Sequence, residues 1–88
     1  TMSWGLIPHW TKQKPDYGFL LKTINCRDDS LIANKPIWNS IKCTKRCIII
    51  AQGFYEWQKN VEKIPHYIHR KDGKLLCLAG LYDSVQFD

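Results

Sequence analysis

The feature that most constrains this chain is the segment CIIIAQGFYEWQ, which runs from Cys47 to Gln58. Its β-branched apolar residues are typical of a buried strand, which is expected to end at the turn formed by Gln52 and Gly53. Three aromatic residues then surround one carboxylate, Glu56. The segment therefore requires a sheet with a core beneath it, and the place of Glu56 among aromatic rings needs a separate explanation.

The length of 88 residues allows one small domain with a thin core. A chain of this size buries only about 60% of the surface that its unfolded form exposes. Its composition, 44% hydrophobic and 24% charged, is that of a soluble globular protein. No apolar run approaches the roughly 20 residues of a membrane-spanning helix, and no secretory signal is visible. We therefore expect neither a membrane protein nor a secreted one.

The order of segments predicts an α+β fold with an antiparallel, barrel-like sheet and short helices. Asp29 or Ser30 could cap one helix, and Pro36 suits the first turn of another. The Asp72-Gly73 pair predicts a β-hairpin turn. The last extended segment is apolar on both faces, so it is expected to be central or covered on both sides. The expected extended segments are 3–10 (a short strand entering a turn), 19–27, 47–57, 64–70 and 75–83.

A second informative segment is TINCR, residues 23–27. If it is a strand, Thr23, Asn25 and Arg27 share one face and Cys26 lies on the other. Arg27 could then bind a phosphate with its guanidinium fork, and Asn25 could both donate and accept hydrogen bonds. The plainer interpretation is a solvated sheet face. Cys26 is expected to be a core residue, not a nucleophile beside Asn25.

Two interpretations are open for Glu56. A carboxyl group partly desolvated by Tyr55 and Trp57 would have a raised pKa, because burial disfavours the charged form, and could act as a general acid or base. Alternatively, Glu56 is an exposed glutamate of an edge strand whose aromatic neighbours face the other way. Trp4 and Trp57 could stack on nucleic-acid bases, although core packing is the commoner role of tryptophan.

The net charge of +5 and the sequence pI of about 9.1 favour an anionic partner, nucleic acid first. A solvated basic surface is the alternative, because the lysines are scattered along the chain. The four cysteines are expected to be reduced thiols. Cys43 and Cys47 are four residues apart, unlike the C-x2-C of a zinc ribbon, and no histidine lies at metal-binding spacing. We expect no metal and no other cofactor.

The motifs WGLIPHW, TINCR, RCIIIAQGFYEWQ and LAGLYD occur in this order and resemble those of an SRAP domain, the SOS-response-associated peptidase family. The resemblance covers nearly the whole chain. It implies a compact α+β domain with a barrel-like antiparallel sheet and a positive groove for single-stranded DNA. Residues 1–88 are expected to be a single, partial SRAP domain, because the sequence shows neither the family's N-terminal Cys-Gly-Arg nor its H-x-R-M-P motif.

The resemblance also implies a chemistry, in which the family recognises abasic sites in single-stranded DNA and traps them covalently. Its nucleophile is an N-terminal cysteine, absent from this chain, whose α-amine and thiol convert the sugar aldehyde into a Schiff base and then a thiazolidine. Asn25 resembles the asparagine that holds the amine and the sugar, and Glu56 resembles the glutamate that shuttles protons. Arg27 resembles an arginine that grips backbone phosphate, and Trp4 and Trp57 are expected to lie along the DNA.

The sequence hypothesis is thus an abasic-site sensor of the DNA damage response that forms a DNA–protein cross-link, an SRAP-type enzyme with peptidase or lyase activity. The alternatives are a thiol (auto)peptidase and a non-catalytic reader of single-stranded DNA or modified bases. The 88 residues alone are expected to be inactive. We expect a monomer, with replication-associated proteins as candidate partners, located in a nucleus or in a bacterial cytoplasm or nucleoid.

Overall fold

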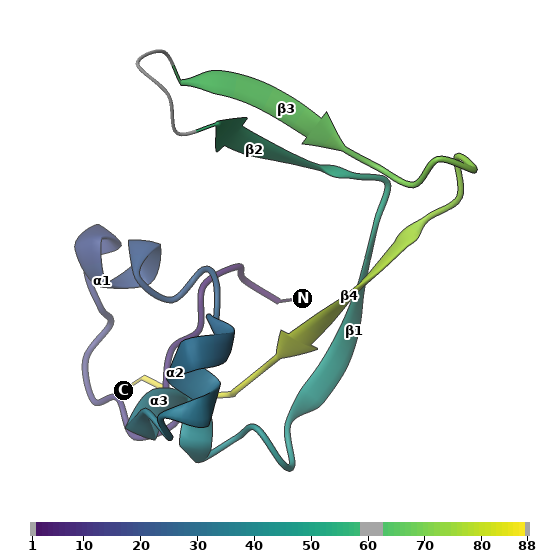
Figure 1. Ribbon diagram of the computed structural model, residues 1–88. Coiled ribbons are helices and arrows are strands. Elements are labelled where there is room, and N and C mark those ends of the chain that lie inside the picture. The colour runs from purple at the N-terminus through teal and green to yellow at the C-terminus, as the bar shows by residue number, and fades with distance from the viewer. Residues whose placement is uncertain (1, 59–62, 88) are drawn as a thin grey trace. The chain divides into compact units, whose positions relative to one another are not determined.

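The computed structural model describes residues 2–58 and 63–87. Short helices precede antiparallel strands along the chain (Figure 1), which confirms the predicted class. The chain divides into two compact units, Thr1–Cys47 with Leu81–Asp88 and Ile48–Gly80. The elements are α1 (Tyr17–Leu21), α2 (Asp28–Ile32), α3 (Pro36–Asn39), β1 (Arg46–Ala51), β2 (Phe54–Gln58), β3 (Ile64–Ile68) and β4 (Leu76–Leu81).

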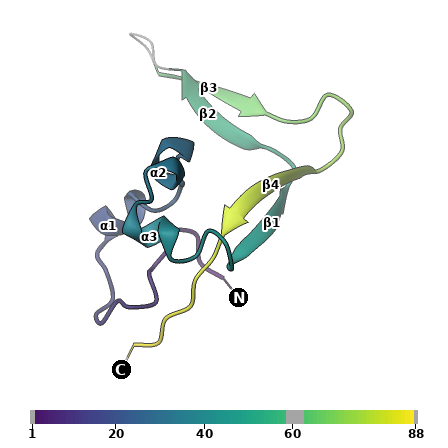
Figure 2. The same cartoon turned by 60° about the horizontal axis from the view of Figure 1, so that its bottom comes forward.

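The first unit is built around a small apolar core of Leu6, Trp38 and Ile41. Ile41 is 1% exposed. Leu31 of α2 and Ile37 of α3 pack against this core, and the two helices contact each other (Figure 2). The thiol of Cys26 packs against this core, and burial raises its pKa. The prediction that Cys26 is a core residue is confirmed.

The starts of the helices agree only partly with the sequence prediction. Pro36 occupies the first turn of α3, as predicted. Asp29 and Ser30 do not cap α2, because the helix already begins at Asp28 with Arg27 as the N-terminal cap residue. The helix thus begins two or three residues before the first helical position that either predicted cap would give, and the carboxylate of Asp28 accepts the backbone N–H of Asp29.

The segment 19–27 is not extended, and this prediction is wrong. The carboxylate of Asp16 accepts the backbone N–H of Phe19 at 2.8 Å and caps α1, which carries the chain in helical form to Leu21. Thr23 then turns inward, is 7% exposed, and donates its hydroxyl hydrogen to the carbonyl of Leu20. It therefore shares no strand face with the exposed Asn25.

The segment 3–10 also lacks the predicted strand and follows an irregular path. Gly5 has a φ of +102°, which favours glycine over any other residue and turns the backbone sharply. Next to it, the backbone N–H of Leu6 donates to the carbonyl of Thr23 at 3.1 Å. This hydrogen bond joins the WGLIP segment to TINCR.

The apolar run forms β1 and ends at Gln52 and Gly53, as predicted. β1 pairs with β4 in a two-stranded sheet. Alternate residues of both strands are exposed, and Ile48 and Ile50 are 70% and 65% exposed. The expectation that the last strand is covered on both faces is therefore wrong for this sheet.

β2 and β3 form the second sheet, an antiparallel pair in which Glu56 lies opposite His66 and Tyr55 lies opposite Tyr67. The prediction of strands in 47–57 and 64–70 is thus confirmed, with two strands separated by a turn in the first range. The strands form two two-stranded sheets, the form that the predicted antiparallel architecture takes here.

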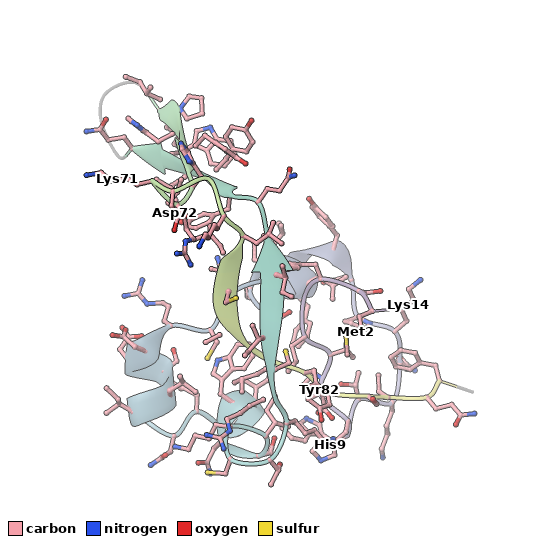
Figure 3. The ribbon with its side chains drawn as sticks, turned by 90° about the vertical axis from the view of Figure 1, so that its right-hand side faces the viewer. Met2, His9, Lys14, Lys71, Asp72 and Tyr82 are labelled. Carbon is pink, nitrogen blue, oxygen red and sulfur yellow. The ribbon has the colours of Figure 1, made fainter. Side chains whose placement is uncertain are left out.

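The turn at Asp72 and Gly73 is real, but it does not make a β-hairpin. Gly73 has a φ of +73°, and its N–H donates to the carbonyl of Arg70 at 3.2 Å. Figure 3 shows Lys71 and Asp72 at this turn. The flanking strands nevertheless pair elsewhere, β3 with β2 and β4 with β1. The hairpin prediction is wrong because the break at Gly53 divides the preceding segment into two strands, β1 and β2. β4 pairs with β1 and β3 pairs with β2, so β3 and β4 do not pair with each other.

Gly53 leaves no room for a side chain, and replacing it is expected to disturb the β2–β3 sheet. A Cβ atom there would lie 2.5 Å from the ring of Tyr67 and 2.6 Å from the carbonyl oxygen of Ile68. We expect Gly53→Ala to lower the free energy of unfolding by about 1–3 kcal/mol, measured by urea denaturation. Gly18→Ala is the control, since a Cβ there meets only ordinary contacts. Equal denaturation midpoints for the two variants would contradict this packing.

Candidate functional site

The five residues predicted for the site belong to different units of the chain. Trp4, Asn25 and Arg27 lie in the first unit, and Glu56 and Trp57 lie in the second. All five are exposed. The site residues thus form two groups, one in each unit.

Trp4 is fixed beside the TINCR segment by a hydrogen bond. Its indole N–H donates to the carbonyl of Ile24 at 3.0 Å, while the side chain as a whole stays 62% exposed. Because Ile24 directly precedes Asn25, the bond holds an exposed indole next to the backbone of the predicted catalytic amide. The structure thus brings Trp4 and Asn25 together, although not through the strand that the sequence predicted.

Arg27 is held by a partner that sequence reasoning missed. Its guanidinium donates to both carboxylate oxygens of Asp29, with 3.1 Å from Nε to Oδ1 and 3.1 Å from Nη2 to Oδ2. The hydrogen bond from Arg27 lowers the pKa of the Asp29 carboxyl. Both side chains are exposed, and exposed ion pairs contribute little to stability. A phosphate can therefore compete with Asp29 for this guanidinium.

Glu56 lies in the middle of β2 and its side chain is exposed. Successive strand residues point to opposite faces, so Tyr55 and Trp57 lie on the face away from Glu56. The rings of Tyr55 and Tyr67, 5.0 Å apart between centroids, mark that aromatic face. The expectation that Tyr55 and Trp57 enclose the carboxylate is therefore wrong for this hairpin, and the catalytic role of Glu56 stays a prediction.

His66 is the residue directly across the ladder from Glu56. Its Nε2 atom lies 3.0 Å from the Oε1 atom of Gln58, the next residue of β2 on the same face as Glu56. Sequence reasoning assigned His66 no functional role, since no histidine lies at metal-binding spacing. The register of the β2–β3 pair is the information that would have identified His66 as the cross-strand partner of Glu56.

Comparison with known proteins places this arrangement in a family. The model of the SOS response associated peptidase (SRAP) family matches residues 1–88. The chain belongs to the SRAP family. This confirms the resemblance on which the sequence hypothesis was built.

Relatives of this SRAP chain come from yeast, vertebrates and bacteria. It is 38% identical over 88 residues to the abasic site processing protein YMR114C of Saccharomyces cerevisiae, covering 99% of this chain and 23% of that protein. It is 37% identical over 100 residues to the abasic site processing protein HMCES of Xenopus tropicalis, covering 93% and 30%. It is 42% identical over 85 residues to the abasic site processing protein YoaM of Bacillus subtilis, covering 94% and 36%.

A solved structure supports the same fold. A crystal structure of a protein from Bacteroides thetaiotaomicron is 38% identical and matches with a TM-score of 0.76, covering 93% of this chain and 36% of that one. The SRAP chain therefore spans about a quarter to a third of the length of the relatives it matches.

A buried carboxylate organises the first unit of the SRAP chain. The side chain of Asp83 is 1% exposed and accepts hydrogen bonds from Nδ1 of His9 at 2.8 Å and from Nζ of Lys45 at 2.6 Å. The backbone N–H groups of His9 and Ser84 donate to it as well, at 2.8 and 2.9 Å. Figure 3 shows His9 beside Tyr82, the residue that precedes Asp83. These contacts join the WGLIPHW and LAGLYD motifs.

The pKa of Asp83 reflects two opposing causes. Burial raises the pKa. The hydrogen bonds from Lys45, from His9 and from two backbone N–H groups lower it by a larger amount, so the pKa lies well below its usual range. Asp83 is therefore ionised near neutral pH and serves as a structural anchor. Sequence reasoning missed it because its partners are far away along the chain.

The described residues also bear on metals, thiols and membranes. Across 2–58 and 63–87, no three side chains among His, Cys, Asp and Glu gather as metal ligands. Cys26, Cys43, Cys47 and Cys77 are free thiols. Within the same part of the chain, none of the helices has the length and apolar character needed to cross a bilayer.

Proposed function

We propose that this chain is part of an abasic-site processing protein that captures lesions in single-stranded DNA as a covalent adduct. The observation that carries the proposal is the SRAP match over residues 1–88, with relatives named as abasic site processing proteins at 37–42% identity. The nucleophile in this proposal is an N-terminal cysteine outside the 88 residues, so the activity belongs to the full-length polypeptide.

The proposed reaction needs a group that moves protons. An α-amine has a pKa of about 7.7–8.0, so much of it is protonated near neutral pH and cannot attack. Glu56 takes that proton, and the free amine adds to the sugar aldehyde to give a carbinolamine. Glu56 then returns the proton to the carbinolamine oxygen. This oxygen leaves as water, and the lone pair of the nitrogen forms the C=N bond. The cysteine thiol adds to this carbon while the nitrogen gains the thiol's proton, closing the thiazolidine.

Asn25 is proposed to hold the amine and the sugar during these steps. Its side chain is exposed, and the Trp4–Ile24 hydrogen bond fixes the loop that carries it. An amide can donate to the sugar oxygen and accept from the amine at the same time. This dual capacity supports a positioning role that a purely donating or accepting side chain could not fill.

DNA binding is proposed to use exposed rings and one guanidinium. Trp4 and Trp57 are 62% and 57% exposed, which leaves their faces free for base stacking worth about 1–3 kcal/mol per base. Because Trp57 lies on the face of β2 opposite Glu56, it would stack on a base that flanks the lesion, where the DNA strand passes round the edge of the sheet. Arg27 would release its exposed ion pair with Asp29 and bind a backbone phosphate instead. The net charge of +5 supports an anionic partner.

The proposal is tested by incubating the full-length protein with a single-stranded oligonucleotide that carries one abasic site, followed by a denaturing gel. We expect a shifted band with the lesion and none with the intact oligonucleotide. Asn25→Ala is expected to slow its formation by about tenfold or more, through loss of positioning. Asn39→Ala is the control, because Asn39 is another exposed asparagine, at the end of α3.

No shifted band with the wild-type protein would reject covalent capture. If binding is instead fully reversible, falls steeply with salt and ignores the lesion, the non-catalytic reader replaces the proposal. A thiol peptidase is the second candidate function, because the family is named as a peptidase. Hydrolysis of test peptides, with sites beyond an initiator methionine, would favour that candidate.

A further inference from the structure

We propose that His66 is a positioning residue for Glu56, which it holds ionised and oriented while DNA covers this face of the hairpin. The inference deepens the proposed function and rests on it. Its basis is the register of the β2–β3 ladder, in which the two residues are direct partners.

The register puts the two side chains on the same face of the sheet. Directly opposed residues of an antiparallel pair have Cβ atoms about 4.5–5.5 Å apart, within reach of a carboxylate and an imidazole. The neighbouring pair, Tyr55 and Tyr67, occupies the opposite face with ring centroids 5.0 Å apart. The alternation of faces is thus observed in the sheet and places Glu56 beside His66 alone among the titratable groups of the two described strands.

Gln58 fixes which nitrogen of His66 is available. Its Oε1 atom can only accept, so Nε2 of His66 carries the hydrogen in the 3.0 Å contact. The other ring nitrogen, Nδ1, is left for a different partner. A protonated His66 then has one N–H bonded to Gln58 and a second N–H to donate towards the carboxylate of Glu56.

Within the described strands β2 and β3, the face around this pair carries no other charged side chain. The other described residues on this face are the apolar Phe54, Ile64 and Ile68, and Gln58, whose amide is uncharged. When DNA covers the face, the carboxylate of Glu56 loses water, which disfavours its charged form. A cation directly across the ladder offsets this loss. His66 would thereby keep Glu56 able to accept a proton from the attacking amine.

The sign of the pH dependence follows from the charge of histidine. A histidine side chain changes charge between about pH 5 and 8 and carries its positive charge at the lower end. A contribution that depends on this positive charge is larger near pH 6 than near pH 8. A purely structural histidine would give the same loss at both values.

The test is the single-turnover rate of adduct formation by the full-length protein on abasic single-stranded DNA. We expect His66→Phe to react about tenfold more slowly near pH 6 and within about twofold of wild type near pH 8. His66→Lys, which keeps its charge, is expected to retain the rate at both values. Gln58→Leu, which removes the orienting acceptor, is expected to lose about threefold near pH 6.

His69→Phe is the matched control. His69 follows the same strand, but its ring stacks on Tyr67 at 5.5 Å between centroids and its Nδ1 contacts the carbonyl of Arg70 at 2.9 Å. We expect this variant to react at the wild-type rate. In a Glu56→Gln background, His66→Phe is expected to cause no further loss, because His66 acts through Glu56.

Two results would overturn the inference and leave the proposed function standing. One is a His66→Phe variant that matches wild type at every pH while Glu56→Gln is inactive. The other is a loss equal at pH 6 and pH 8 that persists in the Glu56→Gln background, which would make His66 structural. A Glu56→Gln variant that reacts at the wild-type rate instead rejects the proposed role of Glu56 itself.

Discussion

Glu56→Gln is expected to slow covalent capture of an abasic site by about 100-fold or more, the usual cost of removing a general acid–base group. Glutamine has nearly the same shape as glutamate, but its amide can neither take the proton of the attacking ammonium group nor return it to the carbinolamine oxygen. The exposed side chain of Glu56 makes a folding defect an inadequate explanation for such a loss. The measurement is the single-turnover rate on a denaturing gel near neutral pH.

Asp72→Asn is the control for charge. It removes one exposed carboxylate from the same unit and so changes the repulsion of DNA phosphate by a similar amount. We expect it to form the adduct at close to the wild-type rate. An equal slowing of both variants would attribute the effect to charge, and an unchanged rate in Glu56→Gln would remove Glu56 from the mechanism.

Asp83→Ala is expected to lower the free energy of unfolding by about 3 kcal/mol, the scale of breaking a buried charged network. The carboxylate is 1% exposed and accepts hydrogen bonds from two side chains and two backbone N–H groups. Truncation leaves the backbone N–H groups of His9 and Ser84 without their acceptor. Urea denaturation of the wild type and the variant measures the difference.

The same network predicts a pH dependence of stability. The pKa of Asp83 is lower in the folded chain than in the unfolded one, where an aspartate titrates at about 3.9. Its contribution is therefore complete above that value and is lost as the pH falls below it. We expect the stability of the wild type to fall more steeply than that of Asp83→Asn between about pH 5 and 3.

Asp29→Asn is the control for this titration, because Asp29 is an exposed carboxylate paired with an exposed arginine. It is expected to change stability little at any pH. If Asp29→Asn and Asp83→Asn gave the same pH profile, the buried network would not be the source of the acid sensitivity.

Local sequence signals predicted the parts of the fold that depend on local physics. The β-branched run of 47–51 formed a strand, Gly53 ended it, and Pro36 opened a helix. The segment 19–27 was predicted wrongly because Asp16, outside it, caps a helix that runs into it. Burial of Thr23 against the preceding turn then removed the alternation that a strand requires.

Local signals could not predict contacts between residues that are far apart in the sequence. The Asp72-Gly73 turn was visible in the sequence, but which strands pair is decided by the whole chain. Asp83 and His9 are 74 positions apart, so no local pattern connects them. The candidate site shows the same division, since the motifs indicated Asn25 and Glu56 whereas the position of His66 follows only from the strand register.

The most direct test of the account is a structure of the full-length protein cross-linked to abasic single-stranded DNA. The carboxylate of Glu56 and the side-chain amide of Asn25 are expected to lie within hydrogen-bonding distance, about 2.7–3.2 Å, of the atoms that join protein to sugar. A structure with Glu56 directed into bulk water, away from the captured sugar, would contradict the account.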